Sequence, residues 1–199
     1  MSDWIKVDAI NASELLQHFD LEDDAIEILH PDMNPEGAVA KLVEHDFLYD
    51  AVRLLAHGLP KREAVWWACL VARQVQTPDT DEDNINALIV TEAWARKPTE
   101  DNRLRCRNLA EKTRYKTPAG WAATAASWST GSLAAEGEPE IEPPFYLYAH
   151  AVAGGVTLAG VELNADEPAE AIKGFLAQGI NLAEGGNGLL ATDDLEKAS

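Results

Sequence analysis

The stretch from Leu59 to Arg73, which reads LPKREAVWWACLVAR, constrains the fold of this chain more than any other feature. Pro60 presets a helical backbone angle and has no N–H, so a helix is expected to begin there. At about 100° per residue, the apolar side chains that follow cover almost the whole circumference of the helix. A helix of this kind is normally packed on several sides at once. The sequence therefore predicts one buried, central helix within an all-helical protein.

The two adjacent tryptophans of this stretch, Trp66 and Trp67, allow two interpretations. Neighbouring residues of a helix point to different sides, so the two rings cannot share one environment. We expect both to lie in the core, because aromatic side chains bury large areas and dominate core energetics. The other interpretation makes one of them a platform for a partner or a ligand.

Composition favours a packed globule with a protein partner. The chain has 199 residues, of which 46% are hydrophobic, and this is enough to bury a sizeable core. It carries 34 acidic and 16 basic residues, for a net charge of −18. This charge disfavours nucleic acids and anionic membranes as general partners, and a basic protein partner fits it better. Nothing in the pattern indicates the oligomeric state.

The charge is unevenly distributed along the chain. Residues 1–58 and 118–199 each carry a net charge of −10, whereas residues 59–117 carry +2. Basic residues concentrate in the segment 96–116, which includes Arg103, Arg107 and Arg114. This segment is either a binding face for an anionic partner or a set of charges that pair with the acidic flanks or face solvent. We favour the second interpretation, because exposed charges mostly contribute little to stability or chemistry.

The cysteines and the N-terminus indicate a cytoplasmic protein. Cys69 and Cys106 form no CxxC motif and have no histidine at ligand spacing, so we expect two reduced thiols. The first residues lack the basic region and apolar core of a signal peptide. Residues 145–161 carry no full charge but are flanked by acids without a basic anchor. We interpret them as a buried helix rather than a membrane span.

Helix signals follow one another along the chain, and only residues 4–10 read as extended. Asn34, Thr99 and Thr117 stand where helices are expected to begin, the run Thr77 to Asp81 reads as a turn and cap, and Gly58 stands where a glycine would end a helix. The pattern predicts an all-α fold of about eight to nine helices, packed as an orthogonal bundle or a short solenoid, without a significant sheet. We expect one domain over residues 1–183, with an acidic loop at 131–144 and a flexible tail at 184–199.

The helix expected over residues 145–163 is rich in alanine and glycine. Gly154 and Gly155 lie inside it, and each costs about 1 kcal/mol relative to alanine. Close approach by a neighbouring helix would offset this cost, and close helix packing is our first interpretation. The alternative is a pocket between this helix and the tryptophan helix.

Motifs that carry chemistry are missing from the sequence. The five histidines are scattered with no pair at i, i+4, and there is no phosphate-binding loop or nucleophile elbow. The acidic run Asp20 to Asp24 flanks a helix start, where carboxylates are expected anyway. We therefore predict no catalytic residue, no metal site and no cofactor.

One group of polar residues surrounds the turn before the tryptophan helix. Arg53 and His57 precede this turn, and Arg62 and Glu63 follow it. Arg53 is placed to pair with Glu63 across the turn, and both His57 and Glu63 suit the dipoles of their helix ends. Because this structural account suffices, a catalytic role would require a pocket at the same place. We treat these four residues and Trp66 as candidate interaction residues.

The segments Asp50 to His57 (DAVRLLAH) and Leu59 to Cys69 (LPKREAVWWAC) resemble the signature of an uncharacterised family of bacterial proteins. The likeness covers about a third of the chain if the helices from Ser13 are included. Members of that family occur beside type VI secretion genes, among them genes for spike-tip and adaptor proteins. The resemblance implies a cytoplasmic accessory role in effector delivery, and it supplies no activity, cofactor or catalytic residue.

Two hypotheses follow for function. The first is a non-enzymatic cytoplasmic adaptor or chaperone-like protein that presents charged faces to a protein partner, such as a secretion-system component or an effector. The second is a small-molecule-binding protein or an enzyme with a pocket near the helix of Trp66 and Trp67. Nucleic-acid binding through residues 96–116 is the least favoured interpretation.

Overall fold

The computed structural model describes residues 4–135 and 137–190, and this part of the chain contains ten α-helices and no strand. The all-α prediction is therefore confirmed, with ten helices against the eight to nine expected. In chain order they are α1 (Ser13–Leu16), α2 (Asp23–Ile28), α3 (Pro35–Glu44), α4 (Leu48–Gly58), α5 (Lys61–Gln74), α6 (Glu82–Arg96), α7 (Glu100–Lys112), α8 (Pro118–Trp128), α9 (Leu147–Leu163) and α10 (Pro168–Ala183).

The predicted caps begin four of these helices. In each case the side-chain oxygen accepts a hydrogen bond from the backbone N–H three residues later, which satisfies a donor that the first helical turn leaves unpaired. The capping residues are Asn34 for α3, Asp81 for α6, Thr99 for α7 and Thr117 for α8.

One predicted helix end differs from the structure. Gly58 is the last residue of α4 rather than a residue beyond it, and Leu59 ends the helix in an extended conformation. The cause is Pro60, whose ring disfavours a helical conformation of the residue before it.

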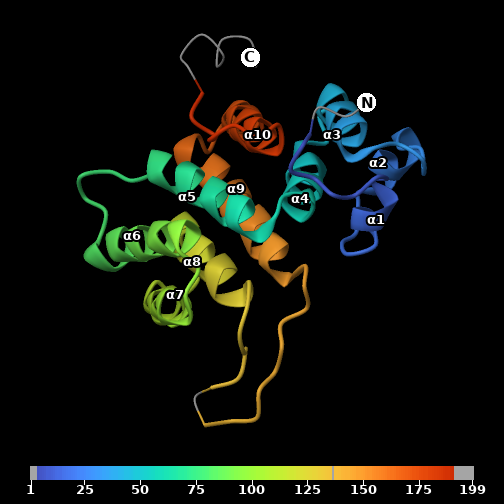
Figure 1. The fold of residues 1–199 in the computed structure, drawn as a ribbon. Coiled ribbons are helices and arrows are strands. Elements are labelled where there is room, and N and C mark those ends of the chain that lie inside the picture. The colour runs from blue at the N-terminus through green and yellow to red at the C-terminus, as the bar shows by residue number, and fades with distance from the viewer. Residues whose placement is uncertain (1–3, 136, 191–199) are drawn as a thin grey trace.

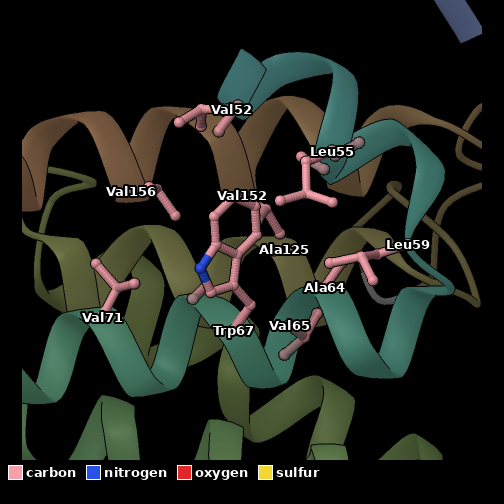
Figure 2. Packing of buried hydrophobic residues seen from close by; sticks show 14 of the residues in the cluster. Val52, Leu55, Leu59, Ala64, Val65, Trp67, Val71, Ala125, Val152 and Val156 are labelled. Atoms are coloured by element: carbon pink, nitrogen blue, oxygen red, sulfur yellow. The ribbon is translucent and has the colours of Figure 1, made fainter. Parts of the chain in front are cut away.

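The helix of the two tryptophans, α5, occupies the centre of the molecule, as the sequence predicts. It packs against α6, α8, α9 and α10, while α9 also packs against α4 (Figure 1). Trp67 lies between α5 and α9, and Figure 2 shows its ring among Leu55, Val152 and Val156. The ring is fully buried and its N–H donates to the carbonyl of Phe175 at 2.8 Å.

Small residues allow α8 and α9 to pack closely. A Cβ atom added to Gly155 would lie only 3.0 Å from the Cβ of Trp121 on α8. Close helix packing therefore accounts for Gly155, whereas a Cβ atom at Gly154 would meet Trp121 only at 4.0 Å. Trp121 lies where the sequence left room for a pocket beside Gly154 and Gly155.

The first helices form one end of the molecule, where α1 packs against α4 and α2 packs against α3 (Figure 1). Residues 4–10, which the sequence predicts to be extended, form no strand, but they contact the C-terminal end of α10. Its Lys6 N–H donates to the carbonyl of Ala183 at 3.0 Å, and Trp4 is buried.

The longest connection runs from α8 to α9 and extends away from the helices (Figure 1). It spans residues 129–146 and contains the predicted loop 131–144. At the C-terminus, α10 ends at Ala183 and residues 184–190 form turns, while residues 191–199 of the predicted flexible tail lie outside the described residues. Among the helices described, none combines the length and the apolarity needed to cross a membrane.

Candidate interaction surface

The connection over residues 129–146, here called the arm, is held in shape by hydrogen bonds between its two limbs. The N–H of Leu133 donates to the carbonyl of Ile141 at 2.8 Å, and the N–H of Ile141 donates to the hydroxyl oxygen of Ser132 at 3.0 Å. These bonds bring the outgoing and returning limbs together a few residues above the helices. The arm is thus bridged at one point, between residues 132–133 and 141.

A buried arginine fastens the arm to α7. Arg103 is 2% exposed and donates to both carboxylate oxygens of Glu100, at 2.6 and 2.7 Å. The Nη1 atom of the same guanidinium donates to the carbonyls of Ser127 and Ser132, at 3.0 and 3.4 Å. Five N–H donors in a rigid fork allow arginine to bind a carboxylate and two carbonyls at once. Donation by Arg103 also lowers the pKa of Glu100, which favours the ionised partner.

Two further basic residues bind the carbonyls of the arm. Arg107 donates to the carbonyl of Ala134 at 2.6 Å, and Lys61 donates to that of Ser129 at 2.6 Å. The first limb of the arm is therefore fixed along its length by cations from α5 and α7. Arg103 and Arg107, which the sequence offered as binding residues, instead position the arm.

The returning limb of the arm presents apolar and acidic side chains to solvent. Phe145 is 65% exposed and Ile141 is 56% exposed, which is unusual for large apolar residues. Glu138, Glu140 and Glu142 are exposed as well, and none of the three forms an ion pair within residues 4–135 and 137–190. This limb therefore combines exposed apolar side chains with acidic groups that form no ion pair among the described residues.

A second surface lies beside Trp66, which is only half-buried. The sequence predicts both tryptophans in the core, and Trp66 packs against the core without being enclosed by it. Its N–H donates to the carbonyl of Asn187 at 3.0 Å, in the chain that follows α10. Together with Arg62, Arg96 and Leu182, these residues line an open groove of about 320 Å³, here called the tryptophan groove. The ring of Trp66 on α5 is partly exposed because the chain around Asn187, rather than a helix, lies on that side.

Two arginines stand at the rim of this groove. Arg62 donates through Nε to the carbonyl of Ala95 at 2.9 Å, and no described carboxylate lies within ion-pair distance of it. The guanidinium of Arg96 lies 6.0 Å from the centre of the Trp66 ring, at the limit of a cation–π contact. Its ion pair with Glu92 is long at 3.9 Å, because Glu92 binds Arg73 more closely, and Arg96 has no other ion pair among the described residues.

A cluster of aromatic and imidazole rings lies where α1, α4 and α9 meet. The ring of His57 is 4.9 Å from that of His150 and 6.4 Å from that of His18. Its Nδ1–H donates to the carbonyl of Arg53 at 2.7 Å, which leaves Nε2 unprotonated, buried and without a partner. Burial, with the neighbouring histidines adding to it, lowers the pKa of His57 to about 4. His57 is thus a neutral core residue.

The four polar residues around the turn do not form one site. Arg53 pairs with the fully buried Asp50 at 2.9 Å, one helical turn away, instead of with Glu63. Glu63 pairs with Lys6 at 3.4 Å. Arg53 pairs with Asp50 because the charge of a buried carboxylate must be compensated. Asp50 also accepts the N–H of Glu22. Of the predicted residues, the structure brings together Arg62, Glu63 and Trp66 in the groove.

Half of the eight basic residues of the segment 96–116 contact the protein's own acids or carbonyls, namely Arg96, Arg103, Arg107 and Lys112. Besides Arg103 and Arg107, Lys112 lies 3.8 Å from Asp83. Arg105 and Arg114 have no ion pair in the part of the chain that the structure describes, and Arg114 has a positive φ of 56° after the end of α7.

Sequence reasoning missed two features of these surfaces. It did not join Trp66 to Asn187, which is 121 residues away, and it did not anticipate that arginines would bind carbonyls of the arm. The segment Gly185-Gly186-Asn187-Gly188 reads as a frayed end, although its glycines also allow the tight turn that places Asn187 on Trp66.

Comparison with known proteins identifies a family without assigning an activity. No curated protein and no solved structure matches the chain significantly. A family model, described as a family of unknown function (DUF6931), matches residues 38–183. Because this match covers α4 to α10 and more than half of the chain, the protein belongs to the DUF6931 family.

Proposed function

We propose that this protein is a non-enzymatic adaptor that binds a partner protein through the arm. The observation that carries the proposal is the construction of the arm itself. A buried guanidinium and hydrogen bonds from three cations to the carbonyls of Ser129, Ser132 and Ala134 hold its first limb. Ile141 is exposed on the returning limb, and Phe145 is exposed at the end of that limb, where its ring also contacts those of His18 and Tyr146. Large apolar side chains on an ordered, projecting segment are typical of an anchor that fills a pocket on a partner.

The chemistry of the arm indicates the kind of partner. Glu138, Glu140 and Glu142 surround the exposed Ile141, so the complementary surface would be basic at its rim and apolar at its centre. The net charge of −18 would also accelerate the approach of a basic partner. A pre-ordered arm loses little conformational freedom on binding, which favours affinity.

The environment of the reactive side chains supports a binding role over catalysis. The thiols of Cys69 and Cys106 are buried, and burial raises the pKa of Cys106 to about 11. A thiol nucleophile requires the opposite, an accessible group with a lowered pKa. His57 is buried with its pKa near 4, outside the range useful to a general base at neutral pH.

The identity of the partner is the further part of this proposal. The resemblance of the Leu59 to Cys69 signature to proteins encoded beside type VI secretion genes suggests a cytoplasmic role in loading a spike-tip protein or an effector. The family match is compatible with this role and leaves the activity open. The adaptor reading predicts that the arm, rather than the helical core, decides which component is bound.

The experiment is co-purification with the spike-tip, adaptor and effector proteins encoded in the same locus, each co-expressed with the tagged chain. Ile141→Ser with Phe145→Ser should abolish recovery of the partner. Ile85→Ser with Ile89→Ser is the matched control, because these residues are exposed on α6, 40% and 52%, away from the arm. Equal recovery of the partner with both double variants would contradict the proposal, as would the absence of any bound component at low salt.

A second candidate function is the binding of a small molecule beside the tryptophan helix. One observation favours it, namely the tryptophan groove, whose volume of about 320 Å³ is at the lower end for ligand sites. The groove lies between α5, the end of α6 and the chain after α10, rather than beside Gly154 and Gly155. A melting-temperature screen of metabolites, compared between the native chain and Trp66→Ala, tests this candidate.

A further inference from the structure

We infer that the tryptophan groove binds an acidic, partly apolar segment of a second partner protein. This site is separate from the arm, so the inference does not depend on the function proposed for the arm. The two surfaces also differ in charge, because the arm is acidic and the groove carries two arginines.

The first argument is the unpaired charge of the groove. The terminal nitrogens of Arg62 make no hydrogen bond or ion pair within the described residues, although Nε is fixed on the carbonyl of Ala95. The terminal N–H groups of Arg62 therefore remain available to a ligand, and the bond of Nε fixes their orientation. A carboxylate is the group that such a planar pair of donors binds best.

The second argument is the combination of this charge with apolar walls. Trp66 and Leu182 line the groove between Arg62 and Arg96. Arg96 lies over the indole ring and its ion pair with Glu92 is long, so it too can turn to a carboxylate. Glu63 is the acidic residue of the groove, and it is compensated by Lys6 at 3.4 Å. Acidic side chains alternating with apolar ones match this arrangement.

The third argument is that the far wall of the groove is ordered. The side-chain oxygen of Asn181 accepts the N–H of Gly188 at 2.9 Å, and its carbonyl accepts the N–H of Gly186 at 2.8 Å. These bonds fix Asn187, whose carbonyl holds the indole of Trp66. The wall is thus built before any ligand arrives, which reduces the entropic cost of binding.

The shape of the groove favours a peptide segment over an enclosed small molecule. Sites for small molecules bury most of their ligand, whereas this groove is open to solvent. The net charge of −18 does not preclude an acidic ligand, because charges more than about 8–10 Å away are largely screened at physiological salt. The local pair of arginines therefore decides the interaction.

The test is a titration of the full chain into a fluorescein-labelled nonapeptide of alternating leucine and aspartate, followed by fluorescence anisotropy. Binding should weaken as salt rises, and a peptide with asparagine in place of aspartate should bind much less. Arg62→Gln and Arg96→Gln should each lower the affinity roughly tenfold. Arg105→Gln is the matched control, because Arg105 is exposed on α7 without an ion-pair partner among the described residues, and it should leave the affinity unchanged.

Further variants separate binding from folding. Arg62→Lys keeps the charge and should recover part of the affinity, while Trp66→Phe keeps an aromatic wall and should retain most of it. Equal affinity of Arg62→Gln, Arg96→Gln and Arg105→Gln for the aspartate peptide would overturn the inference. Tighter binding of a peptide with the sequence of residues 137–145, together with self-association in sedimentation, would also overturn it by making a second copy the occupant. Ile141→Ser with Phe145→Ser should leave the leucine–aspartate peptide bound, whatever becomes of the arm's own partner.

Discussion

The indole N–H of Trp67 donates a 2.8 Å hydrogen bond to the carbonyl of Phe175, and this bond joins the centre of α5 to α10. The approach is possible because Gly179 lies one turn further along α10. A Cβ atom at Gly179 would lie 2.8 Å from Cε2 of Trp67 and 2.7 Å from Cδ2 of Leu55. The ring of Trp67 on α5 therefore occupies the space that a side chain at Gly179 on α10 would need.

Replacing Trp67 by phenylalanine should destabilise the protein by about 2–3 kcal/mol, because it leaves a cavity and removes the only donor from a buried side chain to this carbonyl. Trp66→Phe is the matched control and should cost less than about 1 kcal/mol, since that ring is half-buried. Urea denaturation followed by circular dichroism measures both. Equal losses for the two variants would show that α5 is not packed as described.

Two glycines of α10 should respond oppositely to alanine. Gly179→Ala should lower the free energy of unfolding by about 1–3 kcal/mol, because the new methyl overlaps Trp67 and Leu55. Gly174→Ala should raise it by about 0.5–1 kcal/mol, since nothing lies within 4 Å of the added Cβ and alanine favours the helix. Thermal melting of the two variants side by side checks the difference in sign.

Replacing Arg103 by lysine should loosen the arm. A lysine has no planar fork, so it cannot bind Glu100 and the carbonyls of Ser127 and Ser132 together. We expect a loss of about 2 kcal/mol in stability and faster cleavage of residues 129–146 in limited proteolysis. Arg105→Lys, on the exposed face of the same helix, should change neither quantity. An unchanged cleavage rate in Arg103→Lys would contradict the fastening of the arm to α7.

Acid should destabilise the protein through His57. Its pKa falls from 6.5 to about 4 on folding, so the unfolded chain binds the proton more readily. The resulting stability is fully present above pH 6.5 and is lost as the pH falls toward 4, up to about 3 kcal/mol. His150 from α9, whose own pKa is lowered, and His18, which follows α1, face this ring and oppose its protonation, whereas the backbone carbonyl of Arg53 on α4 accepts from the ring and favours it.

The variant His57→Gln isolates this effect. Carboxylates titrate in both proteins, but the slope of unfolding free energy against pH between 6.5 and 4 should be smaller in the variant. Chemical denaturation at several pH values gives the two slopes, and parallel lines would refute the assignment to His57.

Much of the fold is predictable from local signals in the sequence. Asn34, Asp81, Thr99 and Thr117 mark helix starts because capping depends only on residues within one turn. The centrality of α5 is predictable as well, since an apolar circumference must be covered on all sides. These inferences require no knowledge of distant contacts.

The candidate surfaces are harder to predict, because they depend on which distant segments meet. The spacing of Trp66 and Trp67 shows that they face different ways, but only the packing of α10 decides which ring is covered. In the same way, Arg53 could reach either Asp50 or Glu63, and the burial of Asp50 decides between them. Which carboxylate an arginine pairs with depends on how deeply that carboxylate is buried, and the sequence alone does not show this burial.

Because the arm is fastened at its base, a change in its length should have little effect on the stability of the protein. Because Arg103, Arg107 and Lys61 bind backbone carbonyls, the first limb of the arm is held with little help from its own side chains, apart from the hydroxyl of Ser132. The part of the arm between Ala134 and Ile141 should therefore tolerate exchange, insertion or deletion of residues at little cost to the helices. Across a family that shares this core, such an arm would allow each member to acquire a different partner while its scaffold stays the same.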